Sequence, residues 1–126
     1  MKIHKRPALI AAQYLTSWER HDLESMQEYL HPNLHFKEPL SETTGRDSFL
    51  GFAEKNLHFV NYVKIHSSFD SENEATLIYE FVFVDSIGPQ KTVGHFIFEG
   101  HQIRGIELFY DPRHLEKTMS GGVFSR

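Results

Sequence analysis

A chain of 126 residues, 40% of them apolar, is long enough for one packed domain and too hydrophobic to stay disordered. Its formal charge of −4 gives no general attraction to nucleic acid or to an anionic membrane, so we expect neither as a partner. The sequence has no cysteine, which excludes disulfides, and no apolar run long enough to span a membrane, so we expect a soluble, cytoplasmic protein.

The first part of the chain has helical patterns. Ile10, Tyr14 and Trp18 recur every four residues, which predicts a helix over residues 7–20 with a proline in its first turn. A short second helix is expected to begin at Asp22, because an aspartate side chain can accept a hydrogen bond from the first backbone N–H groups of a helix.

An alternating segment follows. HPN at residues 31–33 predicts the end of the second helix, and LHFKEPL at residues 34–40 has the pattern of a strand. Leu34 and Phe36 share one face, and the alternation puts Glu38 on the same face, which should be the dry interior. A carboxylate that loses water holds its proton more firmly and can act as a base in proton transfer. The alternative is that Glu38 ends the strand and leans into solvent, as most glutamates do.

A third helix is expected after a loop. SETTG at residues 41–45 has the composition of a loop, and Thr44 can cap the helix that follows it. Arg46 is expected at the start of that helix with its charge in solvent. The buried side of the helix is expected to consist of Phe49, Ala53, Leu57 and Val60.

The rest of the chain has β patterns. Strands are expected at residues 62–70, 75–86, 91–99 and 103–111, joined by polar or glycine-containing turns. Pro112 should end regular structure, which leaves one domain with a core over residues 7–112 and a loose tail over residues 113–126. Helices on one side of an antiparallel sheet define an α+β fold.

Both faces of the longest strand are apolar. Leu77, Tyr79, Phe81 and Phe83 face one way, and most of the residues between them are also apolar. We expect the first face to meet the helices. We expect the outer face, which includes His95 on the next strand, to meet a second copy of the chain in a homodimer.

Three features together resemble the NTF2-like (SnoaL-like) superfamily. They are a first helix with tyrosine and tryptophan, a strand that ends FKEP and is followed by TGR, and the closing segment IELFYDP. The likeness covers roughly residues 7–112. It implies a cone-shaped, cystatin-like roll in which about three helices pack inside a curved, mostly antiparallel sheet. The superfamily includes isomerases, cyclases, dehydratases, hydrolases and non-catalytic binding proteins, so the resemblance leaves the activity open.

The ketosteroid isomerase-like members of the superfamily allow a comparison of single residues. In them a tyrosine on the first helix donates a hydrogen bond to the developing oxyanion, and an aspartate before a proline is the base. A gap-free alignment puts Tyr14 and Glu38 of this sequence at those two positions. The second oxyanion donor corresponds to Gly94 here, and a supporting tyrosine corresponds to Ala53, so half of that constellation is missing.

These residues give two alternative functions. In the first, the cone binds a small hydrophobic molecule and acts as a cofactor-independent isomerase or cyclase, with Glu38 as the base and Tyr14 as the oxyanion donor. In the second, the protein is a non-catalytic ligand-binding or dimerisation module. No metal is expected, because His31, His35 and Glu38 do not converge on one point. The expected lining of the ligand pocket is Trp18, Phe36, Tyr79, Phe81, Phe83, Phe96, Phe98, Ile106, Leu108 and Tyr110, which could equally form a solid core.

Overall fold

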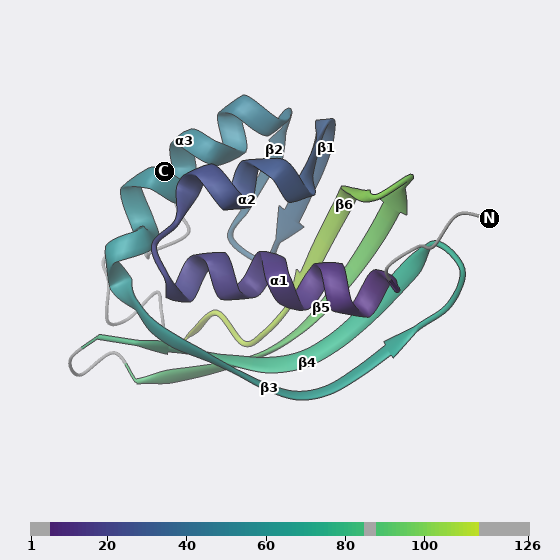
Figure 1. Cartoon of the computed structure of the whole chain (residues 1–126). Helices are drawn as coiled ribbons and strands as arrows, with labels where there is room; N and C mark the ends of the chain where they lie inside the picture. The colour runs from purple at the N-terminus through teal and green to yellow at the C-terminus, as the bar shows by residue number, and fades with distance from the viewer. Residues whose placement is uncertain (1–5, 85–87, 114–126) are drawn as a thin grey trace.

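The computed structural model describes residues 6–84 and 88–113 (Figure 1). Its helices are α1 (Pro7–Glu19), α2 (Leu23–Tyr29) and α3 (Arg46–Asn56), followed by the short 3-10 helix η1 (Leu57–Phe59). Its strands are β1 (Leu30–Glu38), β2 (Ser41–Thr44), β3 (Val60–Asp70), β4 (Glu74–Phe83), β5 (Pro89–Glu99) and β6 (Gln102–Phe109). In the described part of the chain these strands form one sheet in the order β2-β1-β6-β5-β4-β3.

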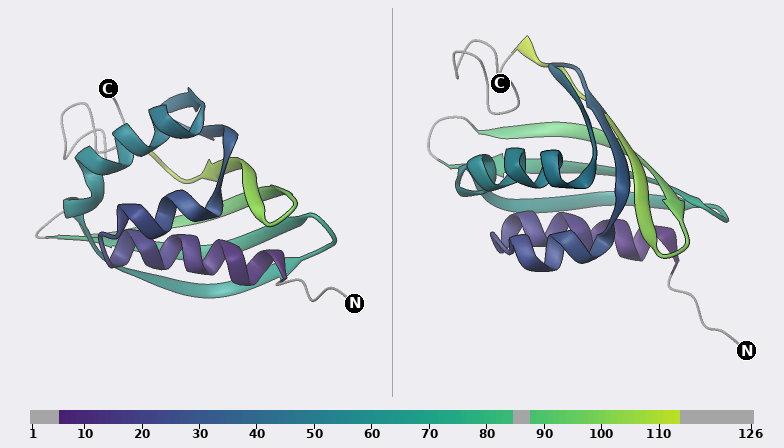
Figure 2. Two further views of the ribbon diagram at one scale, coloured as in Figure 1. Left: turned by 45° about the horizontal axis from the view of Figure 1, so that its top comes forward. Right: turned by 90° about the horizontal axis from the view of Figure 1, so that it is seen from above.

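The helices lie inside the curve of this sheet. Figures 1 and 2 show α1 running along the concave side of β3, β4 and β5, with α2 beside it and α3 near β1 and β2. All neighbouring strands are antiparallel except β1 and β6, which run parallel. The expected α+β cone, with three helices in a curved and mostly antiparallel sheet, is therefore confirmed.

The first two helices begin as local chemistry requires. Pro7 occupies the first position of α1, where its missing N–H is no loss, and the N–H of Ala8 donates to the Asp70 carboxylate at 3.1 Å. Asp22 caps α2 by accepting a hydrogen bond from the backbone N–H of Ser25 at 3.0 Å, as expected.

Two predictions around the third helix are wrong. Residues 41–45 are not simply a loop, because four of them form β2, which pairs with the end of β1. Thr44 therefore belongs to a strand and does not cap α3. The cap position is Gly45, whose φ of 97° suits glycine, and its N–H donates to the Leu34 carbonyl at 2.7 Å. This bond to β1 fixes the point at which β2 ends and α3 begins.

Other element boundaries also differ from the expectation. Strand β1 begins at Leu30, so residues 31–33 lie within the strand and do not separate it from α2. The α-helix ends at Asn56, which puts Leu57 in η1 and Val60 in β3, although both side chains are buried as expected. The predicted tail lies outside the described residues except for Arg113.

The two faces of the sheet differ as the alternation predicted. The inward residues of β4, Leu77, Tyr79, Phe81 and Phe83, are all at most 3% exposed. The outer face keeps partly exposed apolar side chains, namely Tyr62, Phe69, Val93, Ile97 and Phe109. None of the helices among the described residues has the length and hydrophobicity needed to cross a membrane.

Candidate functional site

Glu38 turns inward at the end of β1. It is 5% exposed, and its carboxylate accepts three hydrogen bonds. Oε1 accepts from the backbone N–H of Leu40 at 3.1 Å and from the hydroxyl of Tyr110. Oε2 accepts from the hydroxyl of Ser41. A desolvated carboxylate is costly unless it has such partners, so these donors make the inward position of Glu38 stable.

The strand arrangement brings the three side chains together. A two-residue turn after Glu38 reverses the chain, so that Ser41 pairs with Glu38 in the ladder of β1 and β2. Tyr110 follows β6, which runs parallel to β1 with Lys37 opposite Glu107. The ends of β1 and β6 therefore lie at the same end of the sheet. Tyr110 was predicted in the pocket lining, whereas Ser41 was not predicted as a site residue. Residues 41–45 were assigned to a loop, and the short strand β2 after the turn at Pro39 and Leu40 was not recognised.

Tyr14 is buried on α1 and hydrogen-bonded within the same helix. It is 3% exposed, and its hydroxyl accepts from the indole Nε1 of Trp18 at 3.0 Å. Burial raises the pKa of Tyr14 well above its ordinary value, and the bond from Trp18 offsets this only in part. Tyr14 is therefore a neutral phenol over the physiological pH range. Because its oxygen accepts the Trp18 bond, its own proton can be donated to another acceptor.

Aromatic rings fill the position of the second oxyanion donor. A Cβ atom on Gly94 would lie 2.8 Å from Cε1 of Phe96 and 3.1 Å from Cε1 of Tyr79. The first approach is shorter than real Cβ atoms make and the second is unusually tight, so no acid fits there in this packing. Tyr79 itself is a buried phenol, and both burial and the nearby Tyr14 raise its pKa well above the ordinary value.

The expected lining residues meet in one aromatic core. Trp18 lies edge-on to Phe81 with ring centroids 5.8 Å apart, and Tyr79 lies edge-on to Phe81 at 5.4 Å. Of the ten predicted residues, Tyr110 is half-buried and the others are buried. Phe49 of α3 joins them against Phe36 at 4.8 Å. Their role as the lining of a ligand pocket stays a prediction.

Two polar side chains on the inner face of β5 were missed. Gln90 is 6% exposed and Thr92 is 3% exposed. The amide Nε2 of Gln90 donates to the Lys91 carbonyl at 3.3 Å, whereas its Oε1 is buried with no hydrogen-bond partner in the described part of the chain. Gln90 was assigned to the IGPQ turn, and Thr92 lay within the predicted strand but was not counted among its inward residues. They share the parity of the inward Phe96 and Phe98, and extending the alternation backwards would have found them.

The remaining candidates have structural partners. His35 lies 2.6 Å from Glu42, and His95 on the outer face lies 2.7 Å from Glu74. Arg46 was expected in solvent, but its Nη1 donates to the Leu30 carbonyl at 3.2 Å, and its Nε is buried with no partner among the described residues. Among residues 6–84 and 88–113, no three His, Asp or Glu side chains form a group that could hold a metal ion.

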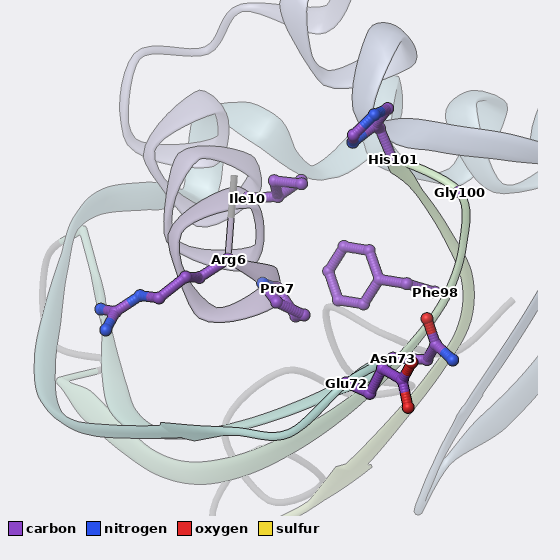
Figure 3. Close-up of a pocket in the computed structure, with 8 residues that line it drawn as sticks. All are labelled: Arg6, Pro7, Ile10, Glu72, Asn73, Phe98, Gly100 and His101. Carbon is purple, nitrogen blue, oxygen red and sulfur yellow. The ribbon is translucent and has the colours of Figure 1, made fainter. Parts of the chain in front are cut away.

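A separate pocket of about 420 Å³ lies at the start of α1 (Figure 3). The turns that join β3 to β4 and β5 to β6 form its other walls. Of the predicted lining residues it contains only Phe98. Its lining is Arg6, Pro7, Ile10, Glu72, Asn73, Phe98, Gly100 and His101. The pocket is therefore distinct from the surroundings of Glu38 and Tyr14.

The fold and the inward acid together define an α+β cone protein of the NTF2-like superfamily. Residues 11–109 match the family model of the SnoaL-like domain, so the chain belongs to the SnoaL-like family. A comparison with curated proteins finds no match.

Solved structures agree with this fold. A protein from Kribbella flavida DSM 17836 superposes with a TM-score of 0.83 at 17% identity, covering 91% of this chain and 94% of the other. An NTF2-like protein from Cytophaga hutchinsonii ATCC 33406 gives 0.76 at 18% identity, covering 90% and 96%. A protein with a ketosteroid isomerase-like fold from Catenulispora acidiphila DSM 44928 gives 0.68 at 14% identity, covering 81% and 85%. At these identities the likeness concerns the fold alone.

Proposed function

We propose that this protein binds a small, largely apolar carbonyl compound inside the cone and catalyses a proton transfer next to the carbonyl. The observation that carries the proposal is the buried carboxylate of Glu38, held by neutral donors at the end of β1. None of these donors is a cation, and no Lys, Arg or His among the described residues forms an ion pair with Glu38. A fixed carboxylate base of this kind typically contributes about 10²–10⁴-fold to a rate.

The proposed chemistry needs no cofactor. Glu38 takes a proton from the carbon beside the carbonyl, and the electron pair of that C–H bond moves onto the carbonyl oxygen to form an enolate. Tyr14 donates a hydrogen bond to that oxygen. In an isomerase the substrate also has a C=C bond beside that carbon, so the enolate is a dienolate, and Glu38 returns the proton to its far carbon while the double bond moves into conjugation with the carbonyl. In a cyclase the enolate carbon attacks a second carbonyl of the same molecule, and the new alkoxide takes the proton.

Gln90 supplies a further polar contact in this proposal. Its buried Oε1 accepts no hydrogen bond from the described residues, and a ligand hydroxyl or N–H group would satisfy it. Buried amide oxygens without a donor are uncommon in native folds, which supports a ligand in the vicinity of β5.

The test is an exchange assay that requires no knowledge of the natural substrate. Cyclic ketones and β-diketones are incubated in deuterated water, and proton NMR follows the loss of the C–H signal beside the carbonyl. We expect Glu38→Gln to remove the exchange that the protein catalyses while leaving ligand binding nearly intact. Glu54→Gln is the matched control, because Glu54 is exposed on α3. Exchange that survives Glu38→Gln would overturn the role of Glu38.

A second candidate is a non-catalytic ligand-binding or dimerisation module. It is favoured by the rings of Phe96 and Tyr79 at Gly94, which leave Tyr14 without a second donor in the place where related enzymes have one. A single donor of this kind contributes about 3 kcal/mol, so catalysis with one donor would be weak. If ketones bind but no exchange above the buffer rate occurs, this second function holds.

We also propose that the outer face of the sheet contacts a second copy of the chain. Val93 and Ile97 on β5 and Phe109 on β6 are 36%, 37% and 52% exposed on that face. Covering them in a symmetric dimer would remove this apolar area from water.

A further inference from the structure

The pocket at the start of α1 has an apolar floor and a polar rim. Ile10 and Phe98 form the floor and are 4% and 6% exposed, with Pro7 beside them. Figure 3 shows the ring of Phe98 turned toward the middle of the pocket. The volume of the pocket, about 420 Å³, is in the range of small-molecule sites. The floor therefore suits a short apolar or aromatic body.

The arginine and the helix end at this pocket are already compensated. The guanidinium of Arg6 lies 3.9 Å from the carboxylate of Asp70, and in Figure 3 it points away from Phe98. Asp70 also accepts the N–H of Ala8, so it neutralises the positive end of the α1 helix dipole. An anionic ligand would have to compete with Asp70 for these groups.

The negative group at the pocket has no such compensation. Glu72 and Asn73 lie side by side on the turn between β3 and β4, next to Phe98 in Figure 3. Within the described ranges, the carboxylate of Glu72 makes no ion pair with Lys, Arg or His. The turn is fixed, because the carbonyl of Asn73 accepts from the N–H of Phe98 at 2.9 Å. A carboxylate and an amide oxygen thus lie beside an aromatic ring.

We propose that this pocket binds a small organic ammonium ion with an apolar or aromatic body. The body packs on Ile10, Pro7 and Phe98. The ammonium group donates to the carboxylate of Glu72 and the side-chain oxygen of Asn73, and the Phe98 ring adds cation–π attraction. This site is independent of Glu38 and of the proposed proton transfer. It binds a cation, whereas the molecule proposed for the cone interior is neutral.

The test compares three probes that differ mainly in charge. Benzylamine, benzyl alcohol and benzoate are titrated separately into the whole isotope-labelled chain, and amide NMR signals are followed. We expect benzylamine to shift the signals of Asn73, Phe98 and Gly100 and the other two to leave them nearly unchanged. Equal binding of benzyl alcohol or benzoate, or no shift with benzylamine, would overturn the proposal.

Two variants test the residues. Glu72→Gln should weaken benzylamine binding about twofold to fivefold, the effect of one exposed ion pair, and Glu54→Gln should leave it unchanged. Phe98→Leu keeps an apolar floor but removes the aromatic ring, so it should weaken benzylamine binding as well. A Glu72→Gln variant that binds benzylamine as well as the parent protein would contradict the site. Because the readout is binding, this result does not depend on whether the chain catalyses ketone exchange.

Discussion

The hydroxyl of Tyr110 donates a hydrogen bond to the carboxylate of Glu38, although the two residues are 72 positions apart in the sequence. The parallel pairing of β1 and β6 makes this contact, because it brings the end of β1 and the segment after β6 to the same place. Ser41 adds a donor from β2. The inward acid is thus held by donors from two separate segments, the start of β2 and the residues after β6.

Replacing Tyr110 by Phe should destabilise the protein. The change leaves a buried carboxylate with one donor fewer, and a hydrogen bond to a charged group contributes about 1.5–3 kcal/mol to the free energy of unfolding. Urea unfolding at neutral pH measures the loss. Tyr29→Phe is the control, because no hydrogen bond from its hydroxyl is found among the described residues. Equal stabilities of the two variants would mean that the Tyr110 bond is not formed in solution.

Replacing Gly94 by Ala should also be destabilising, but for a steric reason. The new Cβ would lie 2.8 Å from the Phe96 ring, so this fully buried ring would have to shift within the core. Overpacking of this kind costs about 1–3 kcal/mol. Gly105→Ala is the matched control on the neighbouring strand, since its Cβ would be 3.5 Å from the nearest atom. Thermal unfolding of both variants measures the difference in stability. If Gly94→Ala is as stable as Gly105→Ala, the space at Gly94 is an open cavity that tolerates the methyl group.

Alkaline pH should destabilise the fold through Tyr14 and Tyr79. Burial raises the pKa of both phenols in the folded state, whereas in the unfolded chain they ionise near pH ~10. The folded state therefore binds more protons above that pH, and its stability is complete below about pH 10 and falls as the pH rises further. Circular dichroism at a series of pH values above about 10 measures this loss of stability. Tyr14→Phe should reduce the alkaline loss of stability.

The outer-face dimer predicts a change in mass. Val93→Glu places a charge at the centre of the exposed apolar residues of β5, and burying it in an interface would be costly. We expect the mass in solution to fall from twice 14.7 kDa to 14.7 kDa, as measured by sedimentation or light scattering. Leu9→Glu is the control, because Leu9 is 47% exposed on α1, away from that face. A parent protein that is already a monomer would refute the dimer.

Local patterns were sufficient for some elements. The four-residue repeat of Ile10, Tyr14 and Trp18 predicted α1, because helical periodicity is a property of neighbouring residues. Alternation likewise predicted which side of β4 is buried. The cap of α2 at Asp22 was also predictable, since a cap involves only the next few residues.

The structure between β1 and α3 was not predictable in the same way. Residues 41–45 have the composition of a loop, and Thr44 is a good capping residue, so local chemistry favoured the wrong assignment. Pairing with β1 and the bond from Gly45 to Leu34 decided the outcome. Tertiary contacts override weak local preferences when they satisfy backbone groups that would otherwise be unpaired.

The sequence by itself determined the fold class and the aromatic character of the interior, because both depend on periodicity along the chain. For Glu38 the alternation gave an inward position as one of two alternatives, and the tertiary structure decided between them. Only the tertiary structure decided the partners of that acid. Ser41 and Tyr110 meet Glu38 through two different strand pairings, and the apposition of Glu72 with Phe98 depends on two hairpin turns. Such contacts join residues distant in sequence, and the register of a sheet that fixes them is set by the packing of the whole domain.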